Sequence, residues 1–254
     1  MTNLNDLHQR INNCTGCGLH ATRVHAVPGE GSDQAQVIFV GEGPGSQEDR
    51  QGRPFVGLAG QFLDKMLASV GLKRENVYIT NMVKCRPPNN RDPFPGEIAA
   101  CSKYLDEQIE LIRPKVIIPL GRHALANWFP GESIGKVRAK ARNVNGQTLF
   151  PLYHPAAALH NGSLRSTIEK DFKGVAALLS QAAAPSREKP PESSNPQLNL
   201  LDGPQETSVP PKPLSRPTKP ANQAGPPTHH AVSAGIPQPL RVSFPFSIQW
   251  TLTK

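Results

Sequence analysis

The chain has 254 residues and carries 28 lysines and arginines against 20 aspartates and glutamates, a formal net charge of +8 at pH 7. No stretch approaches the ~18 uninterrupted apolar residues that span a bilayer, and the first residues, MTNLNDLHQRINNC, lack the charged and then apolar layout of a signal peptide. We therefore expect a cytoplasmic protein without a membrane partner. The basic net charge is compatible with a polyanionic binding partner.

The prolines divide the chain into two parts. Fifteen of the 27 prolines fall within residues 185–254, which are also rich in serine and lysine and poor in large apolar side chains. Such a composition cannot bury enough surface to offset the entropy lost on folding. We predict one globular domain over residues 1–184, present as a monomer, and a disordered tail over residues 185–254.

Within residues 1–184, short apolar runs alternate with segments of helical periodicity. Runs rich in β-branched and aromatic residues predict four buried strands, over residues 36–41, 77–80, 115–120 and 148–153. Apolar residues at helical spacing predict helices over residues 59–70, 97–113 and 166–183. Because strands that alternate with helices form parallel sheets through right-handed crossovers, the predicted fold class is α/β. We expect three α/β/α layers around a central, mainly parallel four-stranded sheet.

Ligands of open parallel sheets bind beyond the carboxyl ends of the strands, so the residues after each predicted strand are candidate site residues. The first strand runs into GEGPG, whose glycines, Gly41 and Gly43, allow a ligand close to the backbone. This loop lacks the lysine and hydroxyl residue of a P-loop, which argues against nucleotide hydrolysis. Its carboxylate, Glu42, is placed either to orient or deprotonate a water or to cap a neighbouring helix.

The other strands also end near residues that could serve a site. Asn81 follows the second strand, Gly121 the third and His154 the fourth. An amide donates and accepts hydrogen bonds together, as the reading of a base edge requires, although a single Asn or His at such a position is often structural. We expect Asn81 and His154 to converge with Glu42 and Phe55 on one cleft.

All four cysteines of the chain fit one set. Cys14 and Cys17 form a CxxC pair near the N-terminus, and Cys85 and Cys101 follow the second strand. Four thiolates in a reducing compartment suit a tetrahedral zinc or an iron–sulfur cluster, and their spacing does not choose between the two. The other possibility is four buried cysteines without a metal.

Six blocks of the sequence carry a resemblance to a known family. CTGC, GEGPG, GRPFVGLAGQFLDKML, VYITNMVKCRPPNNRDP, IIPLG and YHPAAAL, in this order, resemble the family-4 uracil-DNA glycosylases, the iron–sulfur branch of the uracil-DNA glycosylase superfamily. The resemblance covers about residues 4–179 and leaves the tail out. It implies an α/β/α domain that removes uracil from deaminated single- or double-stranded DNA by hydrolysis, leaving an abasic site for base excision repair.

The resemblance also implies roles for individual residues. Glu42 would be the water-associated acid of the first catalytic motif, with Gly41 and Gly43 beside the substrate. Phe55 would stack on the extruded base, Asn81 would read the uracil edge, and His154 would belong to the second catalytic motif. A [4Fe-4S] cluster is implied, with zinc the less favoured alternative, on Cys14, Cys17, Cys85 and Cys101.

Contacts to DNA are expected in three places. They are residues 86–91 (RPPNNR), the residues that follow His154, and residues 136–142 (KVRAKAR), whose alternating basic residues could line one face of an extended segment or form a solvated loop. Leu159 is either a wedge that fills the gap left by the flipped nucleotide or an ordinary core residue.

Two alternatives to turnover stay open, and the tail adds a further hypothesis. A relative in the superfamily is covalently trapped on DNA through a histidine in an arginine-rich insertion, but CRPPNNRDPFPGE has neither; a binding protein that has lost catalysis is the other alternative.

In the tail, QLNLL (residues 197–201) resembles the peptides that dock bacterial repair proteins on the sliding clamp. It begins with Gln197 and ends with Leu201 in place of the preferred Phe.

Overall fold

The computed structural model describes residues 3–183. The tail, with its predicted clamp peptide at residues 197–201, lies outside the described residues, so its disorder and the domain boundary at residue 184 stay predictions. No helix in the described part of the chain is long and apolar enough to cross a membrane. The cytoplasmic location stays a prediction as well.

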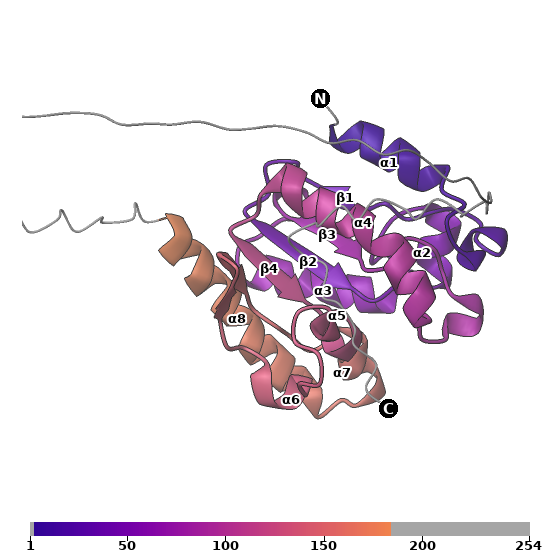
Figure 1. Ribbon diagram of the computed structural model, residues 1–254. Coiled ribbons are helices and arrows are strands. Elements are labelled where there is room, and N and C mark those ends of the chain that lie inside the picture. Colours follow the sequence, from indigo (N-terminus) through magenta and orange to yellow (C-terminus); the bar gives the residue numbers. More distant parts are fainter. Residues whose placement is uncertain (1–2, 184–254) are drawn as a thin grey trace, which may run out of the picture. The chain divides into compact units, whose positions relative to one another are not determined.

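One six-stranded sheet forms the centre of the domain, with the strand order β1-β3-β2-β4-β6-β5 (Figure 1). Its strands are β1 (Glu30–Gly31), β2 (Val37–Gly41), β3 (Tyr78–Asn81), β4 (Val116–Pro119), β5 (Arg142–Val144) and β6 (Gln147–Leu149). The four predicted strands are β2, β3, β4 and β6, and they pair in parallel. The predicted sheet was two strands too small, because β1 and β5 are short antiparallel edges whose residues are at most half-buried and carry no apolar pattern.

The three predicted helices are confirmed as α3 (Leu58–Ser69), α4 (Pro95–Ile112) and α8 (Leu164–Ala183). Gly71 ends the first of them in the left-handed conformation, with φ +72°, as its position predicts. Five further α-helices were not predicted, although Leu4, Leu7 and Ile11 give the first of them an amphipathic pattern: α1 (Leu4–Asn12), α2 (Ser46–Gln51), α5 (Gly121–Ala126), α6 (Ile134–Val137) and α7 (Ala156–His160). Short 3-10 turns cover Gly18–Ala21, Arg74–Asn76 and Pro88–Asn90.

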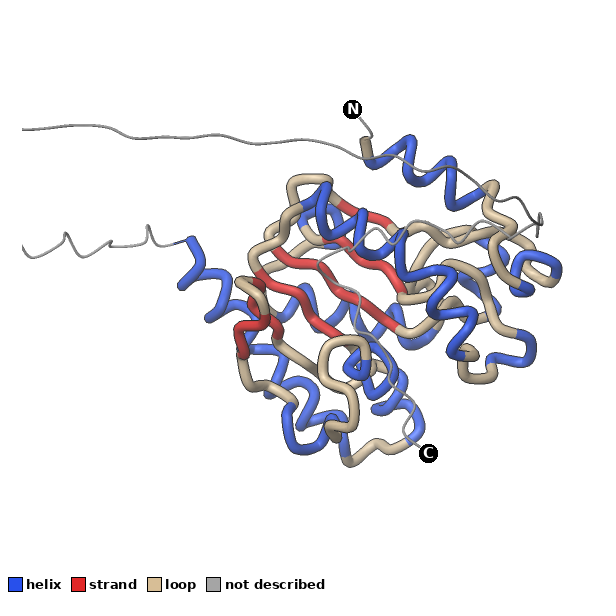
Figure 2. The backbone as a smooth tube through the Cα atoms, in the orientation of Figure 1, coloured by secondary structure: helices blue, strands red, loops and turns tan. Residues whose placement is uncertain are grey.

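The sheet is covered on both faces, which confirms the three-layer α/β/α fold (Figure 2). Because side chains alternate along a strand, Val37 and Phe39 of β2 pack against α3 and α8, whereas Ile38 and Val40 pack against α4 and α5. Helix α1 lies outside α4 and packs on it through an amphipathic face of its own.

The basic stretch at residues 136–142 is not one extended segment, so that alternative is wrong, and its contact with DNA stays a prediction. Residues 134–137 form α6, and only Arg142 begins a strand. Arg138 pairs with Asp171, and Arg142 pairs with Glu132. Two of the four alternating charges are therefore held by carboxylates of the domain itself, and Lys140 donates to the carbonyl oxygen of Lys136.

Strand β2 is the point at which the chain changes direction across the sheet. From β2 the chain passes through α3 to β3 on one side, and from β3 through α4 to β4 on the other side of β2. The segments that follow β2 and β3 lead to α3 and α4 on opposite faces of the sheet, and ligands of such sheets bind in the crevice at the carboxyl ends of these strands. The predicted site residues lie at these ends.

Candidate active site and cysteine cluster

A cavity of about 370 Å³ opens at the carboxyl ends of β2 and β3. Four predicted site residues meet there, because Glu42, Phe55, Asn81 and His154 all line it. Gly43 lines it too, whereas Gly41 lies behind the lining residues. The remaining residues around it are Pro44, Gly45, Glu48, Ala59, Pro87, Asn90, Arg91, Asp92, Ala156 and His160. The predicted convergence on one cleft is therefore correct.

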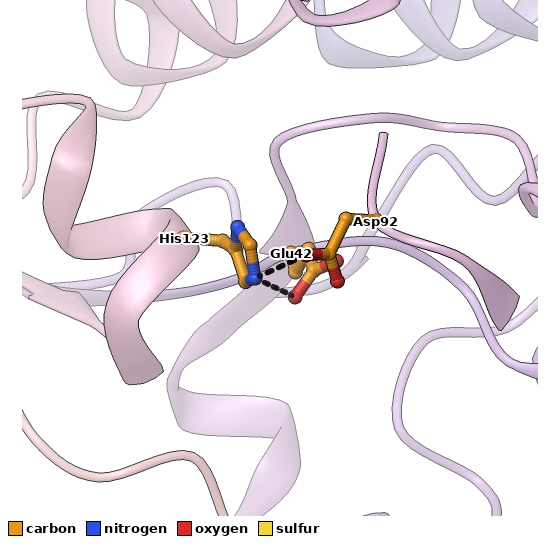
Figure 3. A group of neighbouring side chains, drawn as sticks. All are labelled: Glu42, Asp92 and His123. Atoms are coloured by element: carbon orange, nitrogen blue, oxygen red, sulfur yellow. Dashed lines mark ion pairs between the residues drawn. The ribbon is translucent and has the colours of Figure 1, made fainter. Parts of the chain in front are cut away.

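Glu42 lies in a small group of ionisable side chains (Figure 3). The Nε2 atom of His123, from α5, is 3.7 Å from a carboxylate oxygen of Glu42 and 3.3 Å from one of Asp92. Burial raises the pKa of the Glu42 carboxyl, His123 and Arg122 lower it, and Asp92 raises it further. One ligand atom from each of Glu42, Asp92 and His123 lies within 4.8 Å of the others. Exposed groups of this kind are common without a metal, so we assign none.

Phe55 occupies a loop that is held in an uncommon backbone conformation. Its φ is +51°, in the left-handed region, and its side chain is 5% exposed. A carboxylate oxygen of Glu48 accepts hydrogen bonds from the backbone N–H groups of Val56 and Gly57, at 2.9 and 2.8 Å. Arg74 donates to the carbonyl oxygen of Phe55 at 3.1 Å and to that of Pro54. The aromatic ring is thus fixed 5.4 Å from the imidazole of His154, between ring centroids.

Asn81 ends β3 with its side chain almost fully buried. A Cβ atom at Gly41 would lie 2.3 Å from its Oδ1 atom and 2.7 Å from the ring of Phe55. Glycine at position 41 therefore gives both side chains their place, although it does not itself line the cavity. The fully buried Lys84 donates to the carbonyl oxygen of Asn81 at 2.7 Å and so holds the strand end.

The imidazole of His154 is held in a defined state. Burial lowers the pKa of His154 to about 4, against a weaker opposing effect of Glu48, so the ring is neutral at pH 7. The backbone N–H of Ala156 donates to its Nδ1 atom at 3.1 Å. Since a neutral imidazole has one donor and one acceptor nitrogen, the proton lies on Nε2. The lining of the cavity thus includes a neutral N–H donor.

Several residues of this site were not predicted. Asp92 and His123 meet Glu42 only through contacts between segments far apart in the sequence, whereas Glu48 binds the nearby backbone of Val56 and Gly57. Weak signals existed: His123 comes two residues after Gly121, and Asp92 follows the RPPNNR tract. Leu159 is 51% exposed, so its interpretation as a core residue is wrong. Its interpretation as a wedge that fills the gap left by the flipped nucleotide stays a prediction.

The four cysteines also meet, at a second small cavity on the α1 side of α4. Cys14, Cys17, Cys85 and Cys101 all line it. Arg23 donates to the sulfur of Cys85 at 3.0 Å, and the backbone N–H groups of Gly16 and Lys84 donate to the sulfurs of Cys14 and Cys101, both at 3.3 Å. Donors aimed at sulfur are what metal-bound thiolates require, so the residues fit a thiolate-bound metal group.

Burial bears on the protonation of these thiols. It raises the pKa of Cys85, and that of Cys101 to about 11, so these sulfurs need a bound cation to become thiolates. A tetrahedral zinc and an iron–sulfur cluster both take four thiolates, so the residues fit either group.

Comparison with known proteins identifies relatives of this arrangement. Residues 28–177 match the family described as the uracil DNA glycosylase superfamily. A type-4 uracil-DNA glycosylase of Saccharolobus solfataricus is 50% identical over 190 residues, which cover 71% of this chain and 88% of the relative. One of Archaeoglobus fulgidus is 48% identical over 187 residues, 70% of this chain and 94% of the relative. A type-5 uracil-DNA glycosylase of Pyrobaculum aerophilum is 32% identical over 176 residues, 62% of this chain and 75% of the relative.

Proposed function

Because this chain belongs to the uracil-DNA glycosylase superfamily, with type-4 enzymes among its relatives, we propose that it releases uracil from DNA by hydrolysing the bond between base and deoxyribose. The observation that carries the proposal is the meeting of a carboxylate, an amide, an aromatic ring and a neutral imidazole in one cavity. Each has a part in such a reaction.

Binding begins with extrusion of the uracil nucleotide, since a base inside a duplex cannot be reached. Flipping costs a few kcal/mol and is easiest for a mispaired base or a single strand. Stacking on Phe55 recovers about 1–3 kcal/mol. Asn81 hydrogen-bonds N3 and O4 of uracil, and cytosine, with the reversed donor pattern, leaves buried polar groups unpaired. Recognition therefore comes from a fixed ring and a fixed amide.

Cleavage moves the electron pair of the C1′–N1 bond onto the base, and negative charge gathers on the uracil carbonyl oxygens. The Nε2–H of His154 donates to O2 and stabilises this charge as an oxyanion-hole donor does, an effect worth about 2.7–4 kcal/mol. A neutral ring suits this task because it retains its proton while it donates the hydrogen bond. The low pKa of His154 supports this part of the proposal.

Glu42 serves the water that completes the reaction. Its carboxylate orients the water, whose oxygen forms the new bond to C1′ as that to N1 breaks, and takes up the proton that the water loses. Glu42 then releases this proton to solvent and the uracil anion takes one up from solvent, so an abasic site, neutral uracil and the starting carboxylate remain. The raised pKa of Glu42 makes its carboxylate a stronger base than an exposed one.

Cys14, Cys17, Cys85 and Cys101 are proposed to hold a [4Fe-4S] cluster. The cluster would join the segment after α1 to α4 and to the end of β3, and no step of the reaction passes through it. The donors around the sulfurs support a thiolate-bound metal group, and the resemblance to the type-4 enzymes favours iron over zinc. A broad absorption band near ~400 nm, lost in Cys85→Ser, is expected for iron; a colourless protein with four bound thiolates would contradict it.

Incubation with an end-labelled oligonucleotide containing one uracil, followed by alkali, tests the activity. We expect strand breakage at the uracil, strongly reduced in Glu42→Gln and His154→Ala and unchanged in Glu75→Gln, a control at an exposed acid outside the cavity. An intact strand would contradict the proposal. A heat-stable protein–DNA adduct would favour the trapping alternative instead.

Three smaller parts of the proposal rest on the sequence. Binding of the sliding clamp through residues 197–201 predicts that deletion of this segment abolishes capture by the clamp and leaves uracil release unchanged. A monomer predicts a single mass of 27.5 kDa in light scattering. Both single- and double-stranded DNA are expected substrates.

A further inference from the structure

The described residues expose four large apolar side chains, and three of them are close in sequence to residues that line the uracil cavity. The four are Val24, Leu58, Phe94 and Leu159, with exposed fractions of 62%, 70%, 58% and 51%. Three of them adjoin residues of the cavity lining: Leu58 precedes Ala59, Leu159 precedes His160, and Phe94 follows Asp92 by two residues. Only Val24 lies apart. We call Leu58, Phe94 and Leu159 the apolar rim. Exposed apolar side chains of this kind mark a surface that another molecule covers.

Phe94 is the aromatic member of this rim, and its position is fixed from several sides. It lies between two prolines and is the N-cap residue of α4. Its backbone N–H donates to Glu97 at 2.8 Å. Arg91 forms a two-pronged bond to the same carboxylate, at 2.8 and 2.7 Å, and places its guanidinium carbon 3.7 Å from the centroid of the Phe94 ring. The ring is therefore held before any ligand arrives, and little entropy is lost on binding.

The contact with Arg91 connects this ring to the site. Arg91 also lines the cavity, so the ring that it contacts lies next to the cavity lining. The exposure of the ring leaves other surface free. A nucleobase suits such a surface, since every base has a π-face and base–aromatic stacking does not depend on sequence.

We propose that Phe94, supported by Arg91, is a stacking platform for a nucleobase that neighbours the extruded uracil on the same strand. This inference rests on the proposed function, because it needs uracil-containing DNA in the cavity. The platform acts in binding, and the chemical step takes place at other residues. Single-stranded substrates depend on it most, because their neighbouring bases are not already stacked in a duplex.

Single-turnover uracil release from a single-stranded oligonucleotide tests the platform. For Phe94→Ala we expect the half-saturating DNA concentration to rise about 5- to 100-fold, the range that corresponds to one stacked base, with the maximal rate retained. Phe94→Trp should restore wild-type binding, and Phe94→Leu, which keeps an apolar side chain without a π-face, should not. Val24→Ala is the matched control, an exposed apolar residue away from the cavity.

Substrates that lack one neighbouring base give a sharper readout. The two nucleotides on the 5′ side of the uracil and the two on its 3′ side are replaced one at a time by an abasic analogue. One of these four replacements should weaken binding by the wild type more than the other three do. At that position Phe94→Ala should show no further loss, since ring and base are partners in one interaction. A loss of equal size in both proteins at every position would overturn the proposal, as would wild-type binding by Phe94→Ala. A wild-type protein that releases no uracil would instead refute the proposed function, so the two failures are distinct.

Discussion

Arg74 holds the loop that carries Phe55, so we predict that its loss weakens uracil binding more than it slows the chemical step. Its side chain is 19% exposed and donates to the carbonyl oxygens of Phe55 and Pro54. Left-handed φ values cost an L-residue with a side chain about 1–2 kcal/mol and persist only where the surroundings impose them. Without Arg74, Phe55 is free to relax and its ring to leave the neighbourhood of His154.

The magnitude follows from the bonds that Arg74→Ala removes. Two hydrogen bonds from a charged group to loop carbonyls are worth about 1.5–3 kcal/mol each. Glu30 keeps its paired bonds to Arg53, at 2.7 and 2.8 Å, and Asp64 is 48% exposed, so the lost ion pairs add little. Relaxation of Phe55 returns about 1–2 kcal/mol. The net loss of about 2–4 kcal/mol corresponds to a melting temperature lower by about 5–15 °C.

Thermal unfolding and single-turnover kinetics together check this prediction. The half-saturating DNA concentration should rise about 5- to 100-fold, the value of a lost stacking contact, while the maximal rate changes little. Arg53→Ala is the control, because Arg53 shares Glu30 with Arg74 but donates to neither loop carbonyl. Arg74→Ala with a lowered melting temperature and wild-type DNA binding would refute the reasoning and leave Glu48 as the group that holds the loop.

Three further predictions follow from the cavity. The pKa of His154 is lowered from 6.5 to about 4, so the unfolded state binds more protons than the folded state between these pH values. The free energy of unfolding therefore falls by up to about 3 kcal/mol as the pH drops from 6.5 to 4. Urea unfolding at several pH values measures this loss. His123 lowers the pKa of Glu42 and Asp92 raises it, so the acid limb of the pH–rate profile should move to higher pH in His123→Ala and to lower pH in Asp92→Asn. Gly41→Ala should abolish most uracil release at a stable fold, because its Cβ atom displaces the recognition amide.

Each of these has an internal control. The pH dependence of stability should shrink in His154→Gln, and an unchanged dependence would assign it to other groups. Shifts of the acid limb in the same direction for both partners of Glu42 would contradict the charge argument. Gly96→Ala, where an added Cβ meets nothing within 4 Å, should keep full activity.

Much of this site was predictable because its residues follow strands. A short apolar run in the sequence indicates a buried parallel strand, and the carboxyl ends of parallel strands lie at the same edge of the sheet. Glu42, Asn81 and His154 each lie directly after such a run, so their meeting follows from local patterns and the crossover rule. The edge strands β1 and β5 and the short helices carry no such pattern, and the prediction missed them.

The chain order and periodicity of the sequence by themselves determined the parallel sheet, the layers, the strand-end residues of the cavity and the single set of four cysteines. Tertiary structure alone decided that His123 and Asp92 face Glu42, and that Arg74 and Glu48 hold Phe55 in a left-handed conformation. The physical reason is range. The periodicity of a segment shows which of its residues face the core. These contacts join different segments, and no pattern within one segment shows which other segment it will contact.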